Sequence, residues 1–439
     1  MKINFINNNQ ISKNLLQILF YIYPIIMLKQ SGYVTTYVSL FTIFSLLYLF
    51  LNQIKIKFYL SDFLILLFFL VSIFSTFINS NKIDNLIIFK SISDLRFFLL
   101  YLVIRNLFYH DIIKIKPIIF ICLICCLFLS IDIYIQHIYG KDLFGFPPIE
   151  ERYNGIFYDE AIAGSYIQKF SLLSILAIFF FQIGNNLKKI LIIITGSILA
   201  IGTLLSLDRM PFITIFFGFF LLIFCNKKLR FALFLNIIII FITFVFFVSA
   251  YKPINKRYLD LNKEFNISKI INIILNKKEN DNNENNFQNL DKTKEPILSG
   301  GYGKIFQSTL YVYKYDWLIG TGTKSFQKKC YELSEINKDL SCPPHPHNIY
   351  LEILINMGLL GFIIFLIFIL NIIINLLQFT HSNDENKKIM SNLFIIMLLC
   401  ELIPLRSYGS IFQTVNGSMF WFLLAIISSA FINNKYKKY

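Results

Sequence analysis

Long apolar stretches separated by short polar segments dominate the chain, and they predict its fold. A helix that spans a membrane needs about 20 consecutive, mostly apolar residues. The stretches that meet this requirement are 14–30, 33–51, 58–79, 86–106, 117–138, 161–183, 188–206, 208–226, 231–250, 357–378, 389–405 and 411–432. We therefore predict an all-α polytopic membrane protein with about 12 transmembrane helices.

The spacing of these stretches divides the chain into three parts. Residues 1–250 are expected to hold spans 1–9 with an outer loop at 140–160, and residues 347–439 to hold spans 10–12. Between them, 251–346 are too polar to span, and they predict a large, mostly helical extracytoplasmic loop subdomain. The Asn-rich segment 275–296 inside it is typical of a disordered insert.

Composition excludes a soluble globule. Of the 439 residues, 56% are hydrophobic and 15% are charged, whereas soluble domains are about a quarter charged. The net charge of +15 does not indicate nucleic acid as a partner, because the basic residues lie between the apolar stretches rather than in one patch. No GxxxxGK[ST] phosphate loop occurs, so ATP hydrolysis is not expected.

The distribution of Lys and Arg predicts the orientation. If the N-terminus is cytoplasmic, the loops on that side carry most of the basic residues, such as Lys55, Lys57, Lys188 and Lys189. The short loops on the other side carry few, as expected for a membrane protein whose basic loops stay inside. Both termini are then cytoplasmic, and 251–346 lie outside.

Cysteine positions follow this topology. Cys330 and Cys342 fall in the outer segment, where an oxidising compartment favours a disulfide; two free thiols are the alternative. The CxxCC pattern at 122–126 lies in a predicted span without a nearby His. We interpret those cysteines as buried apolar residues and expect no metal site.

The segment from Pro343 to Glu352 is the strongest candidate for chemistry. It contains two of the five His residues, at the return from the outer subdomain to the membrane. Pro346 suits the first position of a helix, which would place His347 in its first turn. The positive end of a helix disfavours imidazolium, so His347 is a candidate general base. A capping or packing His is the alternative.

Arginine positions indicate an anion site on the same face. Only seven Arg occur beside many Lys, so an Arg is a candidate for contacts that need its planar fork. Arg209 lies in the short outer turn between two predicted spans. It is a candidate for binding an anion; the alternative is an Arg that contacts lipid headgroups and pairs with Asp208. The outer loops also carry Arg152, Glu160 and Arg406.

These segments resemble the O-antigen polymerase and ligase family, membrane glycosyltransferases of the GT-C type. The residues that carry the resemblance are His347-Asn348-x-Tyr350-Leu351 with Gly358-x-x-Gly361, Asp316-Trp317-Leu318-Ile319-Gly320-Thr321-Gly322 with Phe326, and Leu207-Asp208-Arg209. The resemblance covers roughly 140–365. Trp317 and Gln327 stand where many relatives have Pro and Arg, and Lys304 is the nearest equivalent of a second loop Arg.

The resemblance implies an undecaprenyl-diphosphate-linked glycan as donor and a sugar hydroxyl as acceptor, in a bacterial inner membrane with the active site on its periplasmic face. No cofactor or metal is implied. His347 would act as the base in an inverting transfer. The expected substrate-binding residues are Arg209, Arg152, Lys304, Arg406, His345, Glu160 and Asn348.

Three functions remain open. We favour a ligase that moves O-antigen from the lipid diphosphate to lipid A-core. The alternative is a polymerase that extends the glycan on its lipid carrier. A transporter of lipid-linked glycan is less favoured, because the conspicuous groups gather at one surface rather than deep in several spans.

Overall fold

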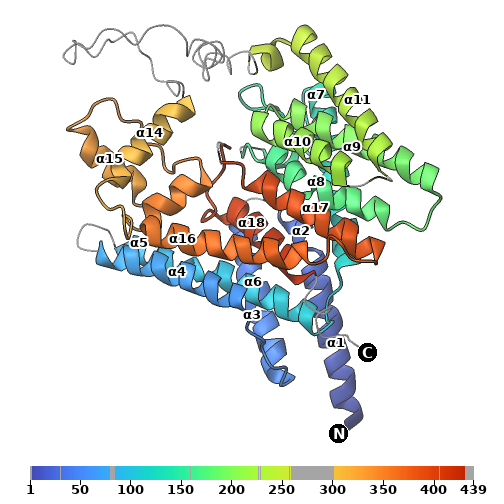
Figure 1. Ribbon diagram of the computed structural model, residues 1–439, viewed down its shortest axis with the longest axis horizontal. Helices are drawn as coiled ribbons and strands as arrows, with labels where there is room; N and C mark the ends of the chain where they lie inside the picture. Colours follow the sequence, from blue (N-terminus) through green and yellow to red (C-terminus); the bar gives the residue numbers. More distant parts are fainter. Residues whose placement is uncertain are drawn as a thin grey trace.

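The computed structural model describes residues 2–29, 31–79, 85–158, 160–225, 227, 229–256, 258, 301–404 and 406–430. The predicted insert 275–296 lies outside these residues. The described part is built from α-helices, with no β-strand (Figure 1). The elements are α1 (Lys2–Tyr21), α2 (Tyr23–Ile26), α3 (Ser31–Leu51), α4 (Leu60–Ile78), α5 (Asn85–Ser93), α6 (Leu95–Tyr109), α7 (Ile115–Tyr139), η2 (Gly155–Phe157), α8 (Ala163–Phe179), α9 (Asn185–Leu205), α10 (Arg209–Cys225), α11 (Arg230–Ala250), α14 (Gly301–Tyr313), α15 (Phe326–Ser334), α16 (Ile349–Leu377), α17 (Glu385–Glu401) and α18 (Thr414–Ser429).

Several of these helices fit a membrane. Among the described residues, six helices are long and apolar enough to cross one: α3, α4, α7, α9, α11 and α16. The helices α8, α10 and α18 are apolar but shorter. The prediction of an all-α membrane protein is confirmed, and the count of about 12 spans stays a prediction. The stretch with internal charges is divided, because α5 and α6 are separated at Asp94.

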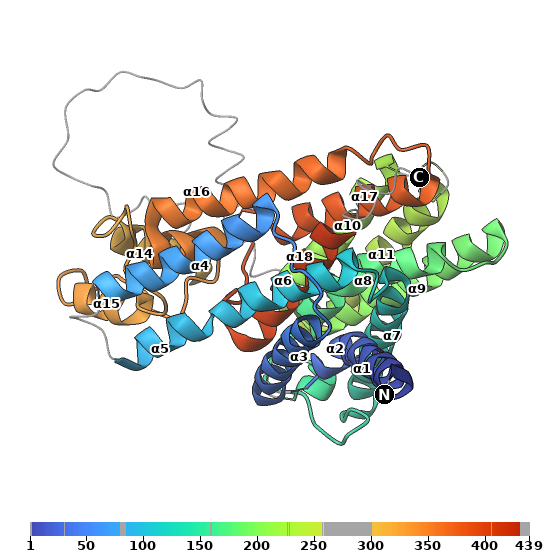
Figure 2. The ribbon, with the colours of Figure 1, turned by 90° about the horizontal axis from the view of Figure 1, so that it is seen from below.

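The helices pack in two groups. In one, α4 runs alongside α16 and α6 packs against α18; in the other, α7, α8 and α9 pack together beside α10 and α11. Figures 1 and 2 show α4 beside α16 from two directions. The helix α17 contacts both α10 and α16, so it joins the two groups. In the first, Trp421 is fully buried between Phe68 and Phe69, and its indole N–H donates to the carbonyl of Ile411 at 3.1 Å.

A break in α16 at Gly358 connects the bundle to residues 301–346, which we name the outer subdomain because the sequence predicts it outside the membrane. Gly358 has φ 63° and ψ −164°, so the helical hydrogen bonds are interrupted there. The segment 317–322 replaces them: the amides of Leu359 and Leu360 donate to the carbonyls of Trp317 and Leu318, at 2.8 and 3.2 Å. A Cβ on Gly358 would overlap the Leu318 carbonyl. Glycine is therefore required here by both conformation and space.

The reverse pairing completes this connection. The amides of Thr321 and Gly322 donate to the carbonyls of Ile355 and Asn356, at 2.7 and 3.1 Å. From α4, the hydroxyl of Ser75 donates to the same Asn356 carbonyl at 2.8 Å. Backbone groups freed by the break are thus satisfied by protein, as an apolar surrounding requires.

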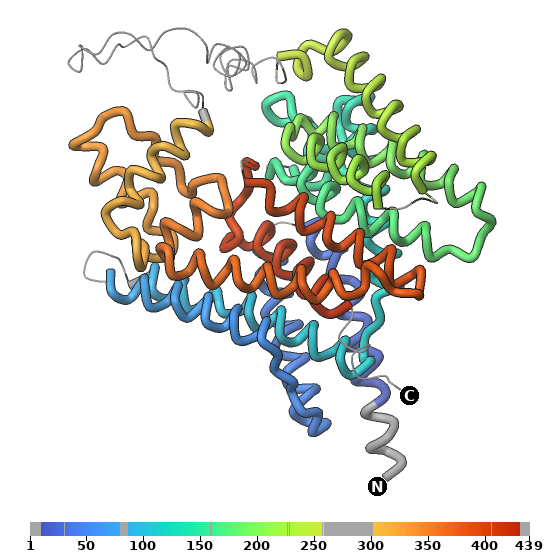
Figure 3. The backbone as a smooth tube through the Cα atoms, viewed as in Figure 1, coloured from blue at the N-terminus to red at the C-terminus, as the bar shows by residue number. Residues whose placement is uncertain are grey.

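The outer subdomain consists of α14 and α15 over the start of α16. Its small core contains Val312, Phe326 and Leu333 with Ile355 of α16. A disulfide joins Cys330 of α15 to Cys342. Figure 3 shows the chain passing from α14 through α15 and back to the start of α16. This return places residues 343–348 between the subdomain and the bundle.

Candidate active site

A polar cavity of about 310 Å³ lies where segments from both helix groups meet the outer subdomain. Its walls come from the loop before α8, the α9–α10 turn, the start of α14, the segment before α16, and the loop 402–413 with the start of α18. The lining residues are Arg152, Ala161, Ile162, Ser165, Asp208, Arg209, Met210, Pro211, Tyr302, His345, His347, Ser407, Tyr408, Gly409, Gln413 and Asn416. The cavity thus brings Arg209 and His347 together.

Two imidazoles and a phenol form one side of the cavity. The ring centroids of His345 and His347 lie 4.0 Å apart, and Tyr302 meets His347 edge to face at 5.4 Å. Burial lowers the pKa of His347 below its ordinary value of 6.5. Burial, with a smaller contribution from His347, lowers the pKa of His345 to about 4. Both rings are therefore neutral near pH 7, and a neutral imidazole accepts protons.

The backbone at His347 differs from the expectation. Helix α16 begins at Ile349, and Asn348 is its N-cap: its side-chain oxygen accepts from the amides of Tyr350 and Leu351, at 3.1 and 3.2 Å. Asn is a strong N-cap residue, so Pro346 stays in the loop. His347 precedes the helix with φ 55°, and its expected place in the first helical turn is wrong.

The side chain of Asn348 is buried and hydrogen-bonded to the protein backbone. Its side chain is 5% exposed, and its amide donates to the carbonyls of Pro404 and Arg406, at 2.6 and 3.2 Å. It does not line the cavity. The side chain caps α16 and holds Pro404 and Arg406 against it; the expected substrate contact by Asn348 stays a prediction.

Two guanidinium groups also line the cavity. Arg209 is the first residue of α10, and Arg152 comes from the loop before α8, 3.8 Å from the carboxylate of Asp208. A Cβ on Gly164 at the start of α8 would lie 2.8 Å from Asp208. The missing side chain lets α8 approach this turn closely. The cavity lining thus combines two cations with two neutral imidazoles.

Three expected binding residues lie elsewhere. Arg406 is 3% exposed and donates to Glu401 at 3.3 Å and to the carbonyl of Cys400 at 2.8 Å; its expected substrate contact stays a prediction. Lys304 is exposed on α14 and Glu160 is half-buried beside the cavity, and neither lines it. Sequence position alone does not determine which loop side chains turn inward.

Some lining residues were not anticipated from the sequence. Tyr302, Tyr408, Gln413 and Asn416 all reach the cavity. Nothing in the sequence distinguishes these two tyrosines among the 24 in the chain. Among the described residues, no group of three or more His, Cys, Asp or Glu could hold a metal ion.

Residues 194–366 match the family model described as O-antigen ligase. This match supports the assignment of the chain to the O-antigen ligase and polymerase family. No match was found among curated proteins. The matched O-antigen ligase segment contains Arg209, Tyr302, His345 and His347 of the cavity, together with the Gly358 break. The wall formed by Arg152 and the loop 402–413 lies outside the matched segment.

The match to the O-antigen ligase family indicates a glycosyltransferase-like enzyme of O-antigen processing, with a lipid-linked glycan as substrate in a membrane. The cavity contains the chemical groups for such a reaction. Guanidinium groups bind phosphate oxygens, and a neutral imidazole accepts a proton from a hydroxyl.

Proposed function

We propose that this protein is a ligase that transfers the O-antigen glycan from undecaprenyl diphosphate to a sugar hydroxyl of lipid A-core. The observation that carries the proposal is the single cavity shared by His347 and Arg209. We further propose that this cavity faces the periplasm at the inner membrane. This orientation rests on the excess of basic residues in the loops predicted to lie on the cytoplasmic side.

In this proposal, Arg209 and Arg152 bind the diphosphate of the donor. Breaking the bond between the anomeric carbon and the diphosphate oxygen leaves negative charge on the diphosphate, and cations placed there stabilise the transition state. The planar fork of each guanidinium suits a bidentate contact with phosphate oxygens. Arg152 is already paired with Asp208, so part of its charge is offset.

His347 takes the proton of the acceptor hydroxyl. The new bond between the acceptor oxygen and the anomeric carbon forms as the bond to the diphosphate breaks. The proton moves to a ring nitrogen of His347, and undecaprenyl diphosphate leaves. A single displacement of this kind inverts the anomeric carbon. Burial, which keeps the His347 ring neutral, supports its role as a base, and the two guanidiniums support a reaction without a metal.

The neutral polar side chains of the cavity are candidates for the sugars. Ser165, Gln413 and Asn416 line it beside the charged groups. Hydroxyl and amide groups donate and accept hydrogen bonds with sugar hydroxyls. His345 contributes a second neutral ring against the glycan. Lys304, exposed on α14, is a candidate contact for the outer part of the donor.

An in vitro transfer assay tests the proposal. The purified protein is given a lipid-diphosphate-linked glycan as donor and, in separate reactions, lipid A-core or a second lipid-linked glycan as acceptor. Product on lipid A-core supports the ligase, whereas longer lipid-linked glycan identifies a polymerase. His347→Ala is the negative control, expected to lose transfer while it remains in the membrane. Transbilayer flux without a new glycosidic bond would identify a transporter instead.

A further inference from the structure

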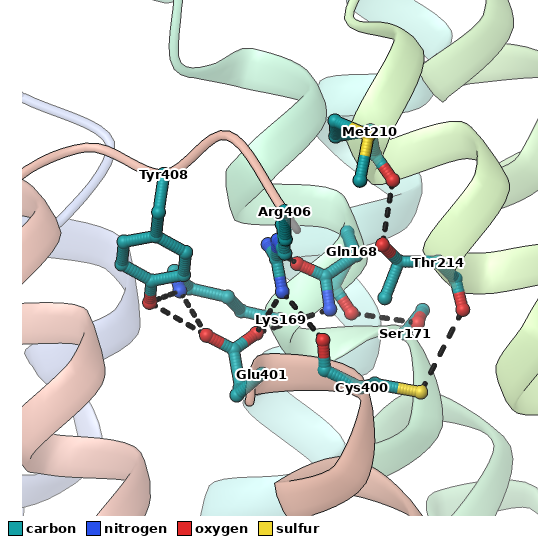
Figure 4. Close-up of polar contacts among 9 residues, drawn as sticks. All are labelled: Gln168, Lys169, Ser171, Met210, Thr214, Cys400, Glu401, Arg406 and Tyr408. Carbon is teal, nitrogen blue, oxygen red and sulfur yellow. Dashed lines mark hydrogen bonds and ion pairs between the residues drawn. The ribbon is translucent and has the colours of Figure 1, made fainter. Parts of the chain in front are cut away.

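A buried charged network adjoins the part of the cavity wall formed by Ser407, Tyr408 and Gly409, and Tyr408 belongs to both. It consists of Gln168, Lys169, Glu401, Arg406 and Tyr408, and Figure 4 shows their side chains pointing toward one another. The residues come from α8, α17 and the loop 402–413. Lys169 and Glu401 are each 2% exposed. These groups have no direct part in the proposed reaction.

Glu401 lies at the centre of the network. One carboxylate oxygen accepts from the hydroxyl of Tyr408 at 2.6 Å and from the ammonium of Lys169 at 2.5 Å. The other oxygen accepts from Gln168 at 3.0 Å and from Arg406 at 3.3 Å. Lys169 also contacts the Tyr408 hydroxyl. The phenol of Tyr408 is therefore held by two buried charges of opposite sign.

Tyr408 connects this network to His347. Its backbone amide donates to the carbonyl of His347 at 2.7 Å. The same loop is attached to the start of α16 by the side chain of Tyr350, whose hydroxyl donates to the carbonyl of Leu402 at 2.5 Å. His347 has a left-handed backbone, which for a residue other than Gly needs support from its surroundings. The hydrogen bond from Tyr408 provides such support.

Stability does not account for the network. Replacing a buried ion pair by apolar residues of similar volume is often neutral or stabilising, because removing charges from water is costly. Ionisable residues within membrane helices are rare and commonly functional. A loop that only needed packing would be held as well by apolar side chains. The charges give the Tyr408 hydroxyl one defined position instead.

We propose that Lys169, Glu401, Arg406 and Tyr408 are positioning residues that orient His347 in the cavity. The inference rests on the proposed function, because it takes His347 as the base. If the phenol of Tyr408 is released, its backbone amide shifts, the His347 carbonyl loses its donor, and the imidazole turns from the acceptor hydroxyl. A misplacement of about 1 Å at a reacting group costs roughly a hundredfold in rate.

Tyr408→Phe tests this connection, since it removes the hydroxyl and leaves every charge in place. We expect kcat for glycan transfer to fall roughly ten- to a hundredfold, with the KM for the donor changed by less than about twofold. The matched control is Tyr166→Phe in α8, which removes a buried hydroxyl that donates to the carbonyl of Pro24 at 2.8 Å, away from the cavity. This control should keep the wild-type kcat.

Lys169→Met provides a second variant, because Glu401 keeps Arg406 and Gln168 as partners. We expect the same loss in kcat. The double variant with Tyr408→Phe should lose no more activity than the less active of the two single variants, because both substitutions break the same connection between the network and His347. A wild-type kcat in either variant, an equal loss in Tyr166→Phe, or full additivity overturns the positioning role. If the wild-type protein transfers no glycan to either acceptor, the proposed function fails instead.

Discussion

The rings of His345 and His347 lie 4.0 Å apart, centroid to centroid, within one cavity. Burial lowers the pKa of both rings. Because both imidazoles are neutral near pH 7, the positive charge in the cavity comes from Arg152 and Arg209. One cavity therefore contains both a proton acceptor and cations that can bind an anion.

The rate of transfer should depend on pH in a way set by His347. The base acts when its ring is neutral, so activity is lost as the pH falls through its pKa. Because burial lowers that pKa from 6.5, we expect kcat/KM to stay constant from alkaline to neutral pH and to fall with a midpoint below pH 6.5. Single-turnover rates across the range measure it. An acidic limb centred above 6.5 would contradict the role of a buried neutral ring.

Arg209→Lys should lose most of the activity, because Lys keeps the charge but not the two-pronged donor geometry. We expect kcat/KM for the lipid-diphosphate donor to fall roughly a hundredfold, which is the usual effect of losing one transition-state donor. Arg230→Lys is the matched control, because Arg230 is exposed at the start of α11 and outside the cavity. Equal kcat/KM values in Arg209→Lys and Arg230→Lys would contradict diphosphate binding by Arg209 and would favour a contact with lipid headgroups.

Gly358→Ala should prevent correct folding. A side chain there would overlap the carbonyl of Leu318 and would stand on a left-handed backbone, at φ 63°. The α16 break would then lose its pairing with 317–322. Gly32→Ala is the control, since a Cβ at Gly32 meets nothing within 4 Å. Detergent-solubilised protein that elutes as one species measures the outcome, and a normal yield of Gly358→Ala would count against the steric argument.

The bond between Cys330 and Cys342 should stabilise the outer subdomain. Closing a loop of this size lowers the entropy of the unfolded chain and contributes about 3 kcal/mol. We expect the Cys330→Ser and Cys342→Ser double variant to unfold at lower temperature, while Cys225→Ser, which removes an exposed free thiol, should keep the wild-type Tm. Thermal unfolding of the purified proteins tests this, and an unchanged Tm in the double variant would refute it.

The pattern of apolar and polar residues along the chain was sufficient to predict most of the helices. Apolar stretches predicted where helices occur because each membrane helix satisfies its own backbone. The predicted stretch with internal charges, 86–106, proved to be two helices separated at Asp94. Asp94 itself is buried, and a count of apolar residues does not predict where such a stretch is divided.

What the sequence by itself determined was the position of the apolar stretches that form helices and the family resemblance around His347 and Arg209, since these depend on neighbours along the chain. Only the tertiary structure decided which side chains face the cavity. Arg406 lies in a loop and Arg209 begins α10, and the sequence predicted both as anion contacts. A buried carboxylate on α17 binds Arg406, whereas Arg209 lines the cavity. Likewise Asn348 caps a helix while its neighbour His347 faces the cavity, because partners distant in the sequence determine where each polar group is satisfied.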